Sequence, residues 1–185
     1  MEIEERTIKP CALKLDDWCK RSATEQDYQE LVTKSTLIRL PNGSPLILYL
    51  RLADYFDFTA LKKTLVAMRY DTSERSAGLK TTSRVFGYQP RITKRRDFCT
   101  STSLATQEAT ANALLFDFGR KVTPIYEKYF PSRARHHKAQ AAKVLPEWTI
   151  ERTVFTSGIV NKNNPLKYHF DAGNFRDVCS CMLGF

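Results

Sequence analysis

The sequence predicts an α+β fold in which N-terminal helices and a hairpin lead into a β-rich region. Two apolar, β-prone runs over residues 36–40 and 46–50 flank a turn with an Asn-Gly pair, the strongest local signal for a hairpin. Apolar residues recur at intervals of three and four over residues 104–129, which predicts a long amphipathic helix. The β-branched and aromatic residues of 148–160 then predict a strand.

Shorter elements are expected around these. A Thr-x-x-Asp pattern that starts at Thr24 resembles a capping box and predicts a short helix over residues 24–34. Leucines spaced four apart predict a helix over residues 58–68. Pro131 opens a second, basic helical segment after the long helix.

The C-terminal region is expected to continue as strands. A turn at residues 162–165 separates the strand at 148–160 from further strands over 166–170 and 178–183. Two of the five cysteines, Cys179 and Cys181, would share one face of the last strand as small buried side chains. No CxxC pair occurs, which argues against a zinc knuckle and favours reduced thiols.

Composition bounds the class of protein. The length of 185 residues predicts a single domain over 1–185. Within it we expect a helix and hairpin region (1–83), a basic loop with helices (84–147) and a β-core region (148–185). The formal charge is +9. The charge favours polyanionic partners, nucleic acid first and acidic membrane surfaces second. The acidic N-terminus and the absence of a long apolar run predict no signal peptide, no membrane span and a cytoplasmic or nuclear location.

Residues 71–96 are expected to form a long basic loop. Serine, threonine, glycine and basic side chains predominate there. The charge is equally consistent with phosphate binding and with an ordinary solvated loop. Its cations are Arg75, Lys80, Arg84, Arg91, Lys94, Arg95 and Arg96.

A His-x-Asp pattern near the C-terminus is the candidate catalytic feature. On an extended backbone, His169 and Asp171 point to the same face, because side chains two residues apart do so. Together they offer two of the three ligands of the 2-His-1-carboxylate triad that holds Fe(II). No histidine follows them, and His136 and His137 are expected on the surface of a basic helix, where they make poor substitutes.

Two segments carry a family resemblance. Thr156-Ser157-Gly158-Ile159-Val160-Asn161-Lys162-Asn163, followed by Tyr168-His169-Phe170-Asp171-Ala172-Gly173-Asn174-Phe175, resembles the TET/JBP family of Fe(II)/2-oxoglutarate dioxygenases, and more closely its phage and fungal branches. Phe86-Gly87-Tyr88-Gln89-Pro90-Arg91, with Cys99 downstream, is similar to the Gly-aromatic-x-Pro-Arg segment of that branch. The resemblance covers residues 84–185 and leaves 1–83 without a counterpart.

The resemblance implies the start of a double-stranded β-helix, or jelly roll, and oxidation of the 5-methyl group of thymine or 5-methylcytosine in DNA. His169 and Asp171 would bind Fe(II), 2-oxoglutarate would be the co-substrate, and Asn174 would contact the flipped base. Arg91 would hold phosphates, and Tyr88 or Phe86 would stack beside the base. A turn-forming role explains Asn174 equally well, and a core position is favoured for Phe86.

The family also has a distal histidine, and an arginine for 2-oxoglutarate, beyond the His-x-Asp pair. Neither is present here, so the chain is expected to be split, truncated or degenerate, with the first two favoured and no turnover by the chain alone. If the gene is split, a second polypeptide would supply both residues. A non-catalytic, basic nucleic-acid-binding module is the main alternative, and an oxygenase acting on a small molecule or a protein is a weaker one.

Overall fold

The computed structural model describes residues 3–9, 17–19, 21–27, 30–74, 80–92, 95–163, 168 and 176–185. The chain forms two compact units, one from residues 1–57 and 165–174 and the other from 58–164 and 175–185. Among the described residues there are four α-helices and two sheets, which confirms a mixed α and β fold. The predicted single domain and its internal boundaries are not tested by this division.

The first unit contains a three-stranded sheet in the order β1-β2-β3. β1 (Glu4–Thr7) runs parallel to β2 (Thr36–Arg39), and β2 pairs antiparallel with β3 (Pro45–Tyr49). The predicted hairpin is therefore confirmed. Its turn depends on Gly43, whose φ of +82° lies in the left-handed region that favours glycine.

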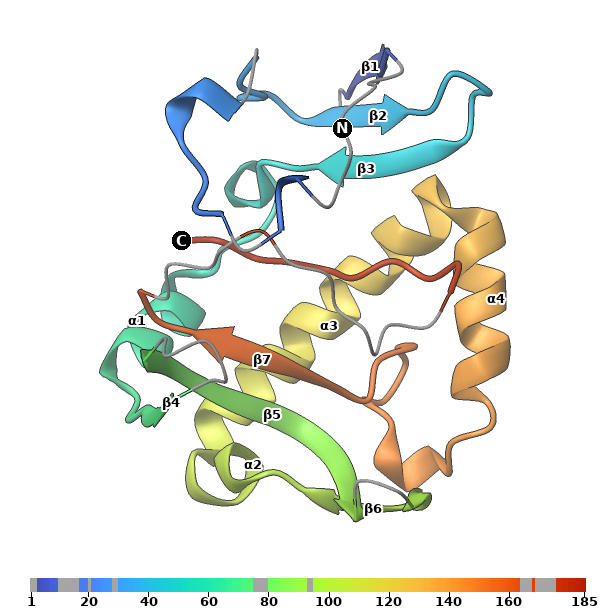
Figure 1. The fold of residues 1–185 in the computed structure, drawn as a ribbon. Helices are drawn as coiled ribbons and strands as arrows, with labels where there is room; N and C mark the ends of the chain where they lie inside the picture. Colours follow the sequence, from blue (N-terminus) through green and yellow to red (C-terminus); the bar gives the residue numbers. More distant parts are fainter. Residues whose placement is uncertain are drawn as a thin grey trace. The chain divides into compact units, whose positions relative to one another are not determined.

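The second unit is built around one long strand, β5 (Lys80–Ile92). It pairs antiparallel with β4 (Asp71–Glu74), β6 (Arg95–Ser101) and β7 (Ser157–Asn161), as Figure 1 shows. Strand partners lie on both sides of Ser83, which pairs with Asp71 and with Asn161. β5 is thus the strand that joins the other three into one sheet.

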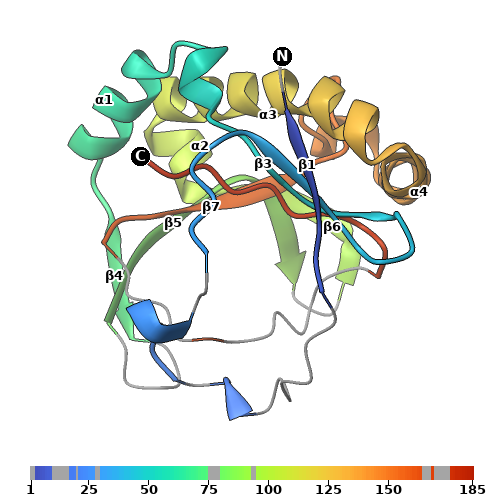
Figure 2. The same cartoon turned by 90° about the horizontal axis from the view of Figure 1, so that it is seen from above.

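Helices cover one face of this sheet (Figure 2). They are α1 (Thr59–Ala67), α2 (Ser103–Gln107) and α3 (Ala109–Tyr129), and α4 (Pro131–Ala141) packs beside α3. Both helices predicted at 58–68 and after Pro131 are confirmed. The apolar core between sheet and helices consists of Leu61, Leu65, Met68, Leu104, Ala111, Leu115 and Val160. No helix in the described ranges has the length and apolar character that crossing a bilayer requires.

The predicted long basic loop at 71–96 is wrong, because its described residues form β4, β5 and the start of β6. The prediction of a loop rests on the charge of the segment, whereas Thr82, Val85, Phe86 and Tyr88 are all typical strand residues. A basic side chain does not exclude a strand when its partners lie on the facing helices, and Arg84 meets that condition.

The single helix predicted over 104–129 is two helices, α2 and α3, interrupted at Glu108. The backbone of Glu108 leaves the helical region, with φ −129° and ψ 57°. This break brings both the Gln107 amide and the Glu108 carboxylate to Arg84, at 2.8 and 3.8 Å. A specific polar contact therefore overrides the helical propensity.

Three other predictions need correction: those for residues 148–160, 24–34 and 178–183. The strand predicted at 148–160 is confirmed only as β7, since Ile150 and Phe155 close a tight loop in which the Ile150 N–H donates to the Phe155 carbonyl at 2.8 Å. The helix predicted at 24–34 is a single 3-10 turn over Glu25–Asp27, and residues 30–34 are not helical. Its capping contact is nevertheless present, because the Thr24 N–H donates to the Asp27 carboxylate at 2.7 Å.

The strand predicted at 178–183 has no regular secondary structure. It is attached to the helices instead: the Cys179 N–H donates to the Tyr126 hydroxyl at 3.4 Å, and Leu183 packs against the core. Cys181 is exposed rather than buried, and Met182 is 92% exposed. Of the strand predicted at 166–170, the structure describes only Tyr168.

Candidate functional site

The predicted metal ligands and base contact, His169, Asp171 and Asn174, lie outside the described residues. Their roles stay predictions. The two other predicted site residues, Tyr88 and Arg91, both lie on β5.

Parts of the two segments that carry the family resemblance, residues 157–160 and 84–87, are neighbours in the sheet. Residues 85–87 of β5 pair with residues 157–159 of β7, so segments some seventy residues apart form adjacent strands. β7 belongs to the stretch that precedes His169, and β5 carries the Gly-aromatic-x-Pro-Arg segment. The sequence does not predict this pairing, because residues 85–91 only interrupt a region whose charge indicates a loop.

Two glycines allow these strands to approach closely. A Cβ atom on Gly158 would lie 2.4 Å from ring atoms of Phe86, so the ring occupies the space above the glycine. A Cβ atom on Gly87 would lie 2.6 Å from the Thr156 carbonyl oxygen, and its φ of +80° also favours glycine. Phe86 packs against the apolar core, in agreement with the position favoured from the sequence.

Tyr88 points toward the helices and is half-buried. Its ring centroid lies 5.9 Å from that of Phe116 and 5.7 Å from that of Trp148, within the range of tilted and edge-to-face aromatic contacts. These contacts fix the orientation of the ring.

Arg91 is exposed at a bulge of the β5–β6 pair. The register shifts between Pro90 and Ile92, and Pro90 lies opposite Cys99, so the hairpin brings Cys99 beside the Pro-Arg pair. An additional residue in one strand bends it and re-aims the side chains nearby. The Arg91 side chain is thereby presented to solvent.

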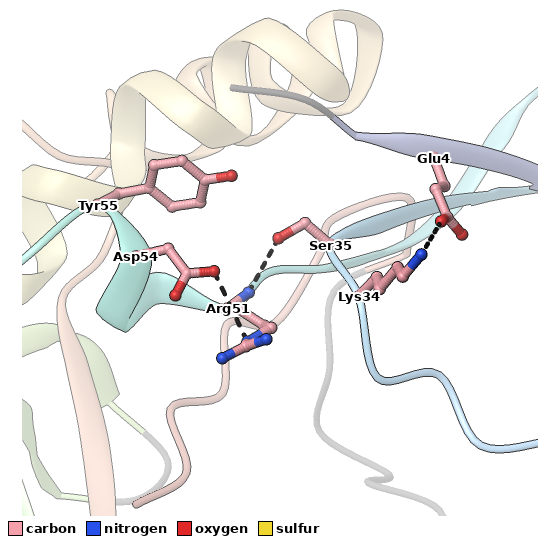
Figure 3. A pocket seen from close by; sticks show the side chains of 6 residues that line it. All are labelled: Glu4, Lys34, Ser35, Arg51, Asp54 and Tyr55. Atoms are coloured by element: carbon pink, nitrogen blue, oxygen red, sulfur yellow. Dashed lines mark hydrogen bonds and ion pairs between the residues drawn. The ribbon is translucent and has the colours of Figure 1, made fainter.

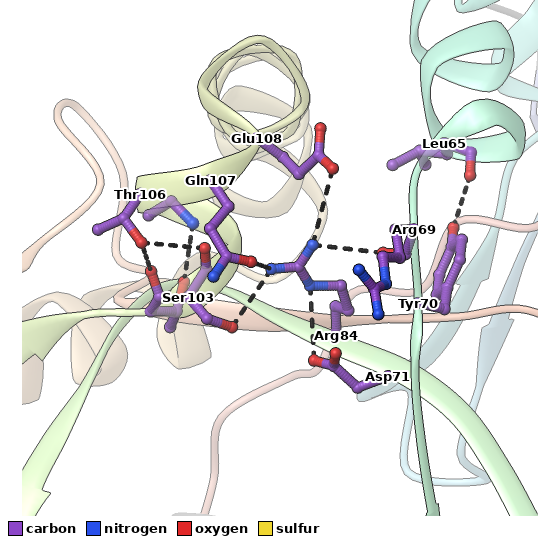
Figure 4. A network of polar contacts seen from close by, with 11 residues as sticks. Leu65, Arg69, Tyr70, Asp71, Arg84, Ser103, Thr106, Gln107 and Glu108 are labelled. Carbon is purple, nitrogen blue, oxygen red and sulfur yellow. Dashed lines mark hydrogen bonds and ion pairs between the residues drawn. The ribbon is translucent and has the colours of Figure 1, made fainter.

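A polar network around Arg84, drawn in Figure 4, was missed from the sequence. The side chain is buried, with 4% of the residue exposed, and donates to Gln107 Oε1 at 2.8 Å, Ser103 Oγ at 3.3 Å and the Arg69 carbonyl at 3.3 Å. Two carboxylates, of Asp71 and Glu108, lie at 3.7 and 3.8 Å. The alternation of residues 84, 86 and 88 could have placed Arg84 on the same face as Phe86 and Tyr88, since side chains two residues apart in a strand share a face.

A polar pocket of about 310 Å³ lies in the first unit (Figure 3). Its charges are internally matched: Lys34 pairs with Glu4 at 3.4 Å, and Arg51 with Asp54 at 3.6 Å. Hydrogen bonds from Arg6 and from Lys34 lower the pKa of the Glu4 carboxyl. The lining therefore carries no excess of either charge. The lining residues are Glu4, Lys34, Ser35, Arg51, Asp54 and Tyr55.

The adjacent histidines of α4 have different environments, although both were expected on the surface. His136 is exposed, whereas His137 is half-buried with its ring 5.9 Å from Tyr126 and 5.6 Å from Phe155. Burial lowers the pKa of His137, and the neighbouring His136 lowers it further. The Nδ1 atom of His137 is buried without a hydrogen-bond partner among the described residues.

In the part of the chain that the structure describes, no group of three or more histidine, cysteine, aspartate or glutamate side chains is arranged to hold a metal ion. Comparisons of the chain with protein-family models, with curated proteins and with solved structures give no match.

Proposed function

We propose that the chain carries part of the active site of an Fe(II)/2-oxoglutarate-dependent dioxygenase that oxidises the 5-methyl group of thymine or 5-methylcytosine in DNA. One observation supports the proposal: the Gly-aromatic-x-Pro-Arg segment lies on β5, and the residues that precede the His-x-Asp motif in the other segment pair with it as β7. Gly158 lies against the Phe86 ring and Gly87 lies against the Thr156 carbonyl, so both glycines allow this close pairing.

The proposal includes a double-stranded β-helix, of which the sheet around β5 would form one layer. Val85 and Ile159 are 37% and 46% exposed and are directly opposite each other on β5 and β7. Since Arg84 and Phe86 point toward the helices, this pair lies on the other face. An exposed apolar pair at the centre of a sheet supports a further layer packing there.

The donor set of the His-x-Asp motif fits Fe(II). A neutral imidazole and a carboxylate suit a metal that keeps open positions, so His169 and Asp171 would hold it. When bound, iron would supply the oxidation of the methyl group, with 2-oxoglutarate and dioxygen as co-substrates.

The remaining residues bind and orient the DNA. The Asn174 amide offers both a donor and an acceptor to the Watson–Crick edge of an extruded base. The exposed Arg91 side chain would contact a phosphate. The Tyr88 ring packs against Phe116 and Trp148 on the helix-covered face of β5, so its part would be to hold this strand in place rather than to contact the base.

Fe(II) binding tests the proposal. Under anaerobic conditions, His169→Ala and Asp171→Ala should each weaken Fe(II) affinity by more than about 100-fold, since losing a residue that merely supports a ligand costs about 10–100-fold. His136→Ala is the matched control, and it should leave the affinity unchanged because its side chain is exposed on α4. Calorimetric titration measures both. Equal Fe(II) affinity for wild type and His169→Ala would refute the proposal.

A nucleic-acid-binding module without catalysis is the second candidate. The exposed cations of α4, Arg135 and Lys138, favour it, since no ion pair between described residues involves them. Under that function, DNA affinity would fall with salt and would not respond to Fe(II) or to His169→Ala. Metal dependence therefore separates the two functions.

A further inference from the structure

The cations of the basic region differ in their surroundings. Arg84 is buried and already surrounded by acceptors, whereas Arg91 is exposed. A further group of exposed cations lies on α4 and the turn after it.

α4 has an inner and an outer side. Ala134 and His137 face inward, where Ala134 is buried and His137 contacts Tyr126 of α3. The outer side presents cations: Arg135 and Lys138, three residues apart and hence neighbours on the helix surface, followed by Lys143. All three residues are exposed.

These charges are not neutralised locally. Residues 128–146, all of which are described, contain five Lys or Arg and no Asp or Glu. Between described residues, no ion pair involves Arg135, Lys138 or Lys143, and the Lys143 ammonium donates only to the neutral Gln140 amide at 2.8 Å. α3 differs, because Asp117 pairs with Lys121 at 2.7 Å.

The arrangement lowers the stability of the helix itself. Neighbouring like charges on a helix destabilise it slightly, and a cation in the first turn, such as Arg133, opposes the helix dipole. No acidic residue offsets this in the first turn of α4. An external anion would remove both penalties.

The outer side suits a phosphate backbone rather than a membrane. A helix that lies on a lipid surface needs a large apolar side, whereas the apolar side of α4 is packed on α3. Apart from Leu145, the exposed residues of 131–145 are charged, polar, proline or alanine. The small side chains of Ala139 and Ala142 leave the cations free to approach a flat, charged surface. At 1.5 Å per residue α4 is about 16 Å long, and such a length of B-DNA carries about 9 phosphate charges.

We propose that the outer side of α4 and the turn after it, with the cations Arg135, Lys138 and Lys143, bind the phosphate backbone of duplex DNA. The inference rests on the proposed function for the choice of DNA as the polyanion. It requires neither iron nor 2-oxoglutarate.

The test is fluorescence anisotropy of a labelled 20-bp duplex of mixed sequence with the full chain, from 50 to 200 mM NaCl and without metal. The triple variant Arg135→Gln/Lys138→Gln/Lys143→Gln should bind more than about tenfold more weakly at 50 mM. Its slope of log affinity against log salt should be shallower by about 2.7, since each lost phosphate contact removes about 0.9.

A charge-matched variant is the control. Lys62→Gln/Lys63→Gln/Arg69→Gln removes the same charge from exposed positions of the same unit and should keep the wild-type slope within about one contact. Equal losses in both triples would overturn the inference, because net charge alone would explain binding. Wild-type DNA affinity in the α4 triple would also overturn the inference. This holds even if the same variant loses affinity for anionic vesicles of phosphatidylserine, because the surface would then bind lipid and not DNA. If the α4 triple does not fold, Arg135→Gln alone should still lower the slope by about 0.9.

The outcomes for iron and for α4 are separate. α4-dependent DNA binding with no His169-dependent Fe(II) affinity would refute the proposed function and support this inference. Intact Fe(II) affinity with α4-independent DNA binding would do the opposite.

Discussion

The cations of β5 and α4 have opposite environments. On β5, Arg84 is buried and meets an amide, a hydroxyl, a carbonyl and two carboxylates. On α4, Arg135 and Lys138 are exposed and no ion pair between described residues involves them. A high net charge therefore identifies no binding surface by itself, because the groups around each cation decide whether it can contact a ligand.

Removing the Arg84 charge should have the largest effect on the free energy of unfolding. Arg84→Met should lower the free energy of unfolding by about 2–4 kcal/mol, because buried hydrogen bonds to a charged group are lost and acceptors are left unpaired. Arg135→Met should change it by less than about 0.5 kcal/mol, as an exposed substitution does. Urea denaturation measures both. Equal effects of the two substitutions would show that Arg84 is not the structural cation described above.

The tight packing of β5 provides the second test. Gly87→Ala should destabilise by about 2–3 kcal/mol, because a Cβ atom meets the Thr156 carbonyl at 2.6 Å in addition to the left-handed φ. Gly43→Ala is a matched control with a similar φ and no atom within 4 Å, and it should cost only about 1 kcal/mol. Urea denaturation gives the difference, which isolates the contact between β5 and Thr156. Indistinguishable values for the two variants would remove the case for close approach there.

The smallest effect concerns the inner side of α4. The pKa of His137 is lowered in the folded state, so the unfolded state binds the proton more readily. Stability should therefore be complete above the unfolded pKa of about 6.5 and should decrease as pH falls below it. Thermal unfolding between pH 5 and 8 should show this dependence, and His137→Phe should flatten it. His136→Gln, at the exposed neighbour, should retain it, and a wild-type profile in His137→Phe would exclude His137 as the cause.

Local signals in the sequence predicted the hairpin, α1, α4 and much of α3, because turn chemistry and helical periodicity act over a few residues. What failed depended on distant partners. β5 was assigned to a loop because the acceptors of Arg84 lie on α2 and at Glu108, and the break before α3 follows from the same contacts. Residues 148–156 have strand-like composition, yet Thr153 closes a loop by donating to the Ile150 carbonyl at 2.8 Å.

The candidate site divides in the same way. The His-x-Asp spacing predicts a pair of metal ligands at His169 and Asp171, and the family resemblance adds the base contact at Asn174; both stay predictions. The pairing of residues 85–87 with 157–159 and the outer side of α4 could be found only in three dimensions. Charge counting pointed to residues 71–96, since it does not distinguish a buried arginine from an exposed one.

The dependence of the sheet on β5 also has a consequence for synthesis. Ser83 pairs with Asn161, which leaves the ribosome about 80 residues later. At about 5–20 residues per second, this edge of β5 waits about 4–16 s for its partner strand. The hairpin with β6 and the helices α1 to α3 can form in that interval, while an apolar strand edge remains open to other nascent chains. Ribosome pausing before residue 157 should therefore increase aggregation, and slower synthesis after it should not.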